Sequence, residues 1–136
     1  MEEKDFNNMK FMVPMYDWPI DLYYGKPSKV KQYLAEKFNI EFDTFDDYCN
    51  GYTAIMEKHG RKHKEINMFF FVNSLDPRSL GLKDVVHTIH HESIHSAWFI
   101  LDYIGIKIDA DNHEALTYLE GYIASRVYDQ ISKWKK

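Results

Sequence analysis

The pattern of apolar and polar positions predicts short strands near the start of the chain. Apolar runs at residues 11–15 and 20–24 have the length of strands. Pro14 lies inside the first run and favours an edge strand or an early end, because proline has no backbone N–H to give to a neighbouring strand. The polar residues 1–8 before this run are expected to be frayed.

The middle of the chain predicts one helix and a further pair of strands. Apolar residues at helical spacing predict an amphipathic helix over residues 28–38. The dense apolar run at residues 66–72 predicts a buried strand. Residues 52–58 can pair with residues 65–72 as a hairpin across a polar turn that contains glycine.

Two long helices are predicted for the rest of the sequence, over about residues 82–103 and 112–133. Gly105 stands where a C-terminal cap of the first helix is expected, and Asn112 or Asp111 is the expected N-cap of the second. Each helix carries an apolar stripe for the core: Val86, Ile89, Ala97, Ile100 and Ile104 on the first, and Leu116, Leu119, Ile123 and Val127 on the second.

These elements predict a single α+β domain over residues 1–136. A small antiparallel or mixed sheet with one packing helix comes first, and two long C-terminal helices follow. A substrate strand could add to an exposed edge of this sheet, and the edge near residues 69–73 is the expected one.

Composition and charge narrow the class of protein. The chain has 136 residues, 45% of them hydrophobic, which is enough for one real core. Its formal charge is −4 and its basic clusters are short, so nucleic acid is not an expected partner. Cys49 is the single cysteine, which excludes an internal disulfide. No apolar run approaches the roughly 20 residues of a membrane span, and the charged start lacks a signal core, so a soluble cytoplasmic protein is expected.

The chemistry of the chain centres on His91-Glu92-Ser93-Ile94-His95, an H-E-x-x-H pattern inside the first long helix. Residues four apart lie on one face of a helix, one turn above each other, so His91 and His95 can offer two imidazole nitrogens to one metal ion. Glu92 is displaced about 100° around the helix, from where its carboxylate can reach a water molecule on the metal. This arrangement is typical of metalloproteases, in which two histidines bind zinc and the glutamate is the general base.

The helical wheel places both histidines opposite the apolar stripe of their helix. Trp98 and Asp102 share the histidine side, and His87 lies one turn earlier. A polar stripe away from the core faces either solvent or a cleft, and position alone does not choose between them. Ordinary surface histidines are therefore the alternative interpretation of this pattern.

A catalytic zinc ion needs a third protein ligand, and the next helix offers candidates. Glu114 projects away from the apolar stripe of that helix, in line with Tyr118 and with Gly121, which would let another backbone come close. We therefore expect Glu114 to be the third ligand, with His113 and Glu120 as alternatives. Glu114 could instead be a first-turn carboxylate that interacts favourably with the helix dipole.

The residues around this motif also resemble a known family. His91, Glu92 and His95, followed by Glu114 on a second helix, resemble the gluzincin type of zinc metallopeptidase. The wider sequence over residues 85–125 looks like a group of small H-E-x-x-H proteins encoded in bacteriophages and prophages, and residues 13–16 are similar to the first strand of that group. The Glu114-Ala115 pair is similar to the third-ligand segment of peptidases that cleave transcriptional repressors. The resemblance implies a minimal zincin-like fold, Zn²⁺ held by His91, His95 and Glu114, and Glu92 as the catalytic base.

One position departs from the family pattern. Many gluzincins have an aspartate four residues after the third ligand, where it holds a ligand histidine, and this chain has Tyr118 there. Either Tyr118 or a carboxylate elsewhere in the chain takes that role, or the site is looser than in the family. Tyr118 is also a candidate donor to the oxyanion of peptide hydrolysis, as are Tyr122 and Tyr103.

Three functions are consistent with the sequence. The leading prediction is a zinc metallopeptidase acting on a protein or peptide substrate, with no nucleic-acid or membrane partner. The second is a non-catalytic zinc-binding interaction module, in which His87 or His113 completes a four-ligand shell. The third is a small interaction protein without a metal.

Overall fold

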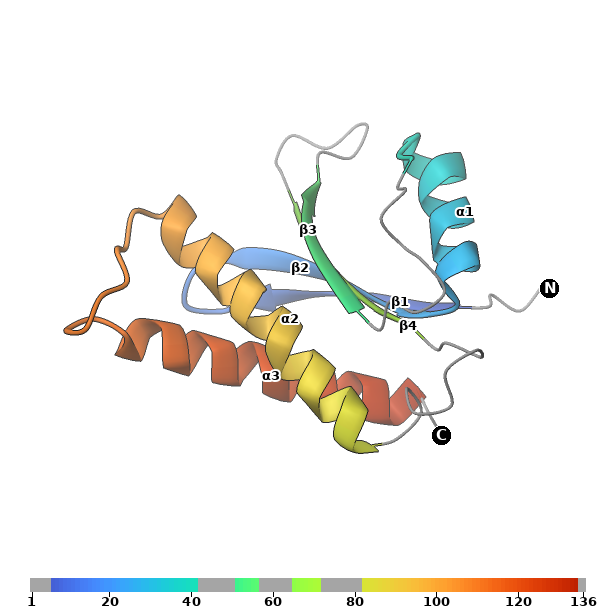
Figure 1. Cartoon of the computed structure of the whole chain (residues 1–136). Helices are drawn as coiled ribbons and strands as arrows, with labels where there is room; N and C mark the ends of the chain where they lie inside the picture. The colour runs from blue at the N-terminus through green and yellow to red at the C-terminus, as the bar shows by residue number, and fades with distance from the viewer. Residues whose placement is uncertain (1–5, 42–50, 57–64, 72–81, 135–136) are drawn as a thin grey trace.

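A computed structural model describes residues 6–41, 51–56, 65–71 and 82–134 of the chain (Figure 1). The side chains of residues 82–84 are not described. The elements in chain order are β1 (Phe6–Val13), β2 (Trp18–Gly25), α1 (Pro27–Phe38), β3 (Gly51–Met56), β4 (Glu65–Phe71), α2 (Leu82–Tyr103) and α3 (Glu114–Trp134).

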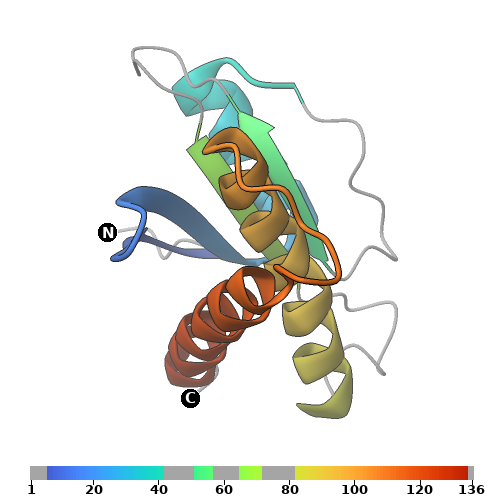
Figure 2. The ribbon, with the colours of Figure 1, turned by 90° about the vertical axis from the view of Figure 1, so that its left-hand side faces the viewer.

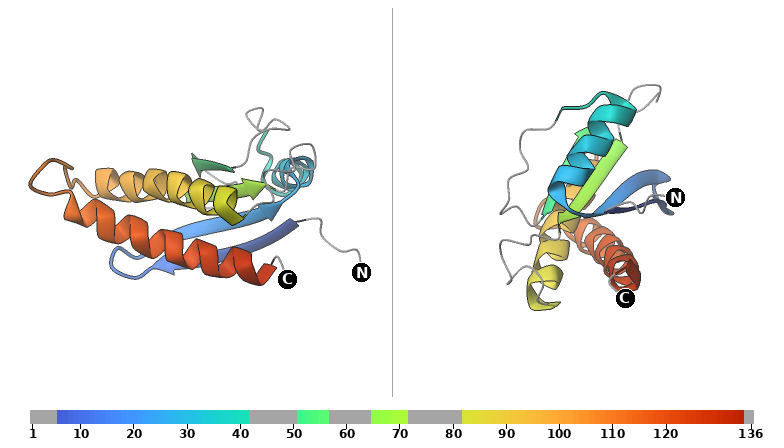
Figure 3. Two further views of the ribbon diagram at one scale, coloured as in Figure 1. Left: turned by 60° about the horizontal axis from the view of Figure 1, so that its bottom comes forward. Right: turned by 90° about the vertical axis from the view of Figure 1, so that its right-hand side faces the viewer.

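The four strands form one mixed sheet in the order β1-β2-β4-β3. The β1–β2 and β3–β4 pairs are antiparallel, whereas β2 and β4 are parallel. Helix α1 covers one face of the sheet, and α2 and α3 cover the other (Figure 1; Figure 3, right). The prediction of an α+β fold with a small sheet, one packing helix and two long C-terminal helices is confirmed.

The sheet lies between two apolar cores because its side chains alternate between its faces. Ile20 and Leu22 of β2 belong to the larger core, which α2 and α3 complete. Tyr23 points to the other face and packs in the smaller core with Leu34 of α1. Strand β4 is buried along its whole length, as the dense apolar run predicted.

The position of β4 overturns one expectation about the sheet. Residues 69–71, expected at an exposed edge, belong to β4, which has β2 on one side and β3 on the other. Among the described residues, the two edge strands are β1 and β3. Local periodicity cannot reveal strand order, which depends on pairing between segments that are distant in the sequence.

Strand β1 begins earlier than expected. Residues 6–8, predicted to be frayed, form its first part and pair with residues 23–25 of β2. The Asn8 amide donates to Asp21 Oδ1 at 2.7 Å and to the Leu22 carbonyl at 3.0 Å, and Phe6 packs in the smaller core. The strand ends at Val13, directly before Pro14, and lies at an edge, in agreement with the role predicted for that proline.

The end of α2 follows the prediction. Gly105 has φ 84°, and the N–H groups of Gly105 and Ile106 donate to the carbonyls of Asp102 and Leu101. This pair of bonds is the Schellman arrangement, which satisfies the last helical carbonyls.

The start of α3 differs from the prediction. The helix begins at Glu114, so neither Asn112 nor Asp111 is its N-cap. The Asn112 amide instead donates to the Lys107 carbonyl at 2.7 Å, and Asp109 accepts from the Asp111 N–H at 2.9 Å. Both side chains therefore stabilise the turn that precedes the helix.

The buried faces of the two long helices are those that the apolar periodicity predicted, except that the buried face of α2 also includes polar residues. Ile89, Ala97 and Ile100 are buried as expected, whereas Ile104 lies beyond the end of α2 and is 41% exposed. The buried side of α2 also carries the polar residues Glu92, Ser93, Ser96. Across the residues that the structure describes, no helix has the length and apolar character needed to cross a membrane.

Replacing Tyr23 with phenylalanine should change how stability depends on alkaline pH. The Tyr23 hydroxyl is fully buried and donates to Asp21 Oδ2 at 3.1 Å. Burial and the neighbouring Asp21 carboxylate raise the pKa of Tyr23 above its usual value. Above about pH 10 the unfolded chain releases this proton and the folded chain keeps it, so folding stability falls as pH rises.

Urea unfolding between pH 8 and 11.5 should show this loss. The wild type should lose up to about 1.4 kcal/mol per pH unit more than Tyr23→Phe above pH 10. At pH 8 the variant should be less stable by about 1–3 kcal/mol, because it leaves a buried carboxylate without one donor. Tyr128→Phe is the matched control at an exposed site. Parallel curves for wild type and Tyr23→Phe would contradict this account of Tyr23.

Candidate metal centre

Helix α2 comes very close to the edge strand β3 at Gly51. A β-carbon at Gly51 would lie 2.7 Å from Thr88 Cγ2 and 3.2 Å from both Glu92 Cγ and the Phe69 carbonyl oxygen. Only glycine leaves enough room for this approach. Gly121, which was expected to let another backbone come close, does not act in this way, because a β-carbon there would have nothing within 4 Å.

The close approach places Glu92 between the helix and the strand. Glu92 is 5% exposed, and the Thr53 hydroxyl of β3 lies 3.0 Å from its Oε1 and 3.2 Å from its backbone carbonyl oxygen. The other carboxylate oxygen, Oε2, lies 4.0 Å from His91 Nε2. One oxygen of Glu92 is therefore held by the sheet, while the second lies beside the imidazole.

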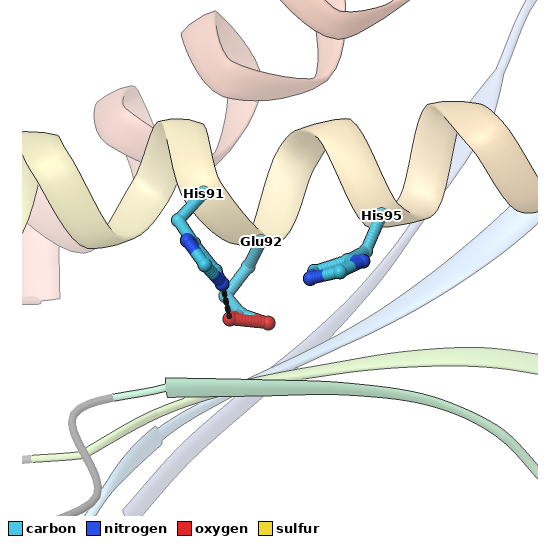
Figure 4. Close-up of side chains that lie close together, drawn as sticks. All are labelled: His91, Glu92 and His95. Carbon is cyan, nitrogen blue, oxygen red and sulfur yellow. Dashed lines mark ion pairs between the residues drawn. The ribbon is translucent and has the colours of Figure 1, made fainter.

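His91 and His95 extend from α2 toward β3, on either side of Glu92 (Figure 4). Both residues are exposed, and their ring centroids are 5.1 Å apart. One ligand atom from each of His91, Glu92 and His95 lies within 4.8 Å of the other two. Two imidazole nitrogens and a carboxylate oxygen at this spacing can hold a metal ion, and this mixed donor set suits zinc and similar transition metals.

Glu114 is not part of this group. It is the exposed first residue of α3. His90 Nδ1 and Glu120 Oε1 lie 2.7 Å apart and thus set the register between the antiparallel helices. Six residues further toward the C-terminus of α2 is Ser96, and six residues toward the N-terminus of α3 is Glu114. Both steps cover about 9 Å along the helix axis. Glu114 is therefore level with His95 along the helices, which diverge toward this end (Figures 1 and 2). Its role as a ligand stays a prediction.

The contact between His90 and Glu120 was not foreseen from the sequence. Glu120 was an alternative third ligand, and His90 had no predicted role. The two side chains lie on facing sides of α2 and α3, so the pair joins the helices on the side away from β3. The other alternative ligand, His113, is exposed in the turn before α3, and His87 is exposed one turn before His91.

The three tyrosines considered as oxyanion donors lie apart from the imidazoles in this structure. Tyr118 and Tyr122 line a pocket with the tip of the β1–β2 hairpin. The Tyr103 ring packs edge-on against Trp18, with centroids 4.6 Å apart. No described contact joins any of them to the His91, Glu92 and His95 group, so the assignment of Tyr118 also stays a prediction.

Two residues of the site, Gly51 and Thr53, were not identified from the sequence. An isolated glycine within a strand pattern is a known sign of close backbone approach. That sign was present at Gly51, but it does not say which element approaches. Thr53 carried no sign of its own, because its role depends entirely on α2 crossing β3.

Comparison of the chain with models of protein families, with curated proteins and with solved structures found no match in any of the three.

The Gly51→Ala substitution should destabilise the fold and disturb Glu92. Its methyl group would lie 2.7 Å from Thr88 Cγ2, which is shorter than a normal contact, and 3.2 Å from the Phe69 carbonyl oxygen, so the expected cost is about 1–3 kcal/mol. Urea unfolding measures this cost. Gly121→Ala is the matched control and should be neutral or stabilising by up to about 1 kcal/mol, because it adds helix propensity without a clash. A Gly51→Ala protein as stable as the wild type would contradict the close approach.

Proposed function

We propose that this protein is a zinc-dependent metallopeptidase of the gluzincin type, with Glu92 as the general base. The observation that carries the proposal is the group formed by His91, Glu92 and His95, in which the glutamate is buried and held by Thr53. Two ordinary surface histidines at helical spacing would not need a buried glutamate between them that is held by a threonine of the sheet. A buried carboxylate beside two exposed imidazoles is a costly arrangement unless it has a function.

Zinc is the proposed metal. The imidazoles of His91 and His95 would hold it, and their separation of one helical turn suits a single ion. When bound, zinc would supply Lewis acidity, lowering the pKa of a coordinated water toward about 7 and polarising a carbonyl group.

Glu92 is proposed to move the proton. Its Oε2 atom lies toward His91, whereas Oε1 accepts from Thr53. The carboxylate can take a proton from the attacking water through Oε2 and pass it to the leaving amine. Thr53 acts as a positioning residue, because its hydroxyl restrains the carboxylate without touching the reacting atoms.

Glu114 is the proposed third ligand. It lies level with His95 in the register of the helix pair, and its exposed carboxylate is not engaged in a described side-chain contact. Tyr118, one turn further along the same helix, is the proposed donor to the oxyanion.

The proposed substrate is a peptide or protein segment in an extended conformation. Within the described residues, β3 pairs with β4 on one side only, and the imidazoles point toward β3 (Figure 4). A substrate segment that added to this edge would form main-chain hydrogen bonds and bring a peptide bond beside Glu92.

A non-catalytic zinc-binding module is the second candidate. The Glu92 carboxylate is itself close enough to be a ligand. If Glu92 binds the metal, no base remains, and the site would have a structural or binding role.

Metal analysis of the purified full chain tests the ligand set. The wild type should hold about one zinc ion per chain. His91→Ala and Glu114→Ala should lose it, because each removes a donor. Glu120→Ala should keep it, since Glu120 is engaged with His90 outside the group. A wild type that takes up no zinc, even after zinc is added back, would exclude both metal hypotheses.

The Glu92→Gln substitution separates the two functions. If Glu92 is the base, the variant should keep its zinc and lose about 10²–10⁴-fold in the rate of cleaving a mixed-sequence quenched fluorescent peptide library. Thr53→Val should keep zinc and show a smaller fall in kcat with little change in KM. Loss of zinc from Glu92→Gln would make Glu92 a ligand and favour the non-catalytic module.

A further inference from the structure

An apolar pocket of about 420 Å³ lies between the tip of the β1–β2 hairpin and the first half of α3. These two elements lie side by side at one end of the molecule (Figures 1 and 3). None of the residues that line the pocket belongs to α2 or β3, so the pocket is separate from the His91, Glu92 and His95 group, although its wall residue Tyr118 is also the proposed oxyanion donor. Its walls include Pro14, Met15 and Tyr16 of the hairpin and Tyr118, Leu119 and Tyr122 of α3.

The walls of the pocket are held in place by core packing and by a hydrogen-bonded turn. Val13 and Leu119 are only 1% and 5% exposed and belong to the larger core. The hairpin turn is closed by a hydrogen bond from the Tyr16 N–H to the Val13 carbonyl at 3.3 Å, and Pro14 restricts the backbone within it. A ligand would therefore meet walls that are already in place, which lowers the ordering cost of binding.

Large apolar side chains surround the pocket and remain in contact with solvent. Met15 is 80% exposed, Tyr118 73% and Tyr122 37%. Single exposed apolar residues are ordinary, but a continuous set around a cavity is typical of a binding site. No charged side chain lines the pocket, so the group that enters it should be uncharged and apolar.

Exposed carboxylates lie close in the sequence to both walls of the pocket. Asp17 directly follows Tyr16 on the hairpin side. On the α3 side, Asp111 is exposed in the turn that precedes the wall residue Ala115. Negative charge at the edge of an apolar pocket favours a partner that carries positive charge around an apolar group.

We propose that this pocket is a docking site for a basic segment of another protein. The segment would insert one aliphatic or aromatic side chain between the hairpin tip and α3, and would place lysine or arginine near Asp17 and Asp111. A free apolar molecule would fill the cavity but gain nothing from the carboxylates. This docking site does not depend on zinc or on peptidase activity.

Titration of the full chain, labelled with ¹³C at the methionine methyl groups, tests the proposal. The probes are the peptide Lys-Lys-Leu-Phe-Leu-Lys-Lys, its counterpart with glutamate in place of lysine, and N-acetylphenylalaninamide. The basic peptide should shift the Met15 methyl signal and leave that of Met12 unchanged, because Met12 is exposed but lies outside the pocket. At low ionic strength it should bind at least about tenfold more tightly than the acidic peptide, and salt should narrow this difference.

Two variants and one control variant make the test specific. Met15→Ser should weaken binding of the basic peptide about fivefold through lost apolar contact, whereas Met12→Ser should not change it. Asp17→Asn should weaken the basic peptide alone; asparagine tolerates the left-handed backbone at this position, where φ is 49°. Absence of a Met15 shift, equal binding of the acidic peptide, or equally tight binding of N-acetylphenylalaninamide would overturn the proposal, the last in favour of a small-molecule site.

Discussion

The close packing of α2 against β3 at Gly51 is the constraint on which the candidate site depends. Without a β-carbon at Gly51, the helix comes near enough for the Thr53 hydroxyl to reach the Glu92 carboxylate. Glu92 lies between His91 and His95 on the helix surface, so the contact that holds the glutamate also turns both imidazoles toward the strand. The geometry of the group thus follows from one helix–strand contact.

The two apolar cores lie on opposite faces of the sheet and support the elements that make this contact. Helix α1 covers one face of the sheet, and α2 and α3 cover the other, which leaves β4 buried in the centre. Strand β3 is supported by β4 along one side and crossed by α2. A site built on such packed elements keeps its geometry better than a site built on loops, because the surrounding core opposes small displacements.

Helix α3 connects the proposed metal site with the apolar pocket at the hairpin tip. The contact between Glu120 of α3 and His90 of α2 fixes where the first turn of α3 lies along the length of α2. That turn carries Glu114, level with His95, and the following turns present Tyr118 and Tyr122 to the pocket. Docking at the pocket and metal binding would therefore act on the same end of one helix, although neither needs the other.

The sequence by itself determined the parts of this protein that depend on local spacing. Periodicity predicted the α+β class and the limits of α2, Gly105 predicted its end, and the four-residue separation placed His91 and His95 on one helix face. Tertiary structure alone decided which strands lie at the edges of the sheet, why residues 6–8 form part of β1, and why Asn112 is not a helix cap. It also brought Thr53 to Glu92 across 39 residues of chain. Such contacts join distant segments whose pairing depends on the packing of the whole domain, so no local pattern records them.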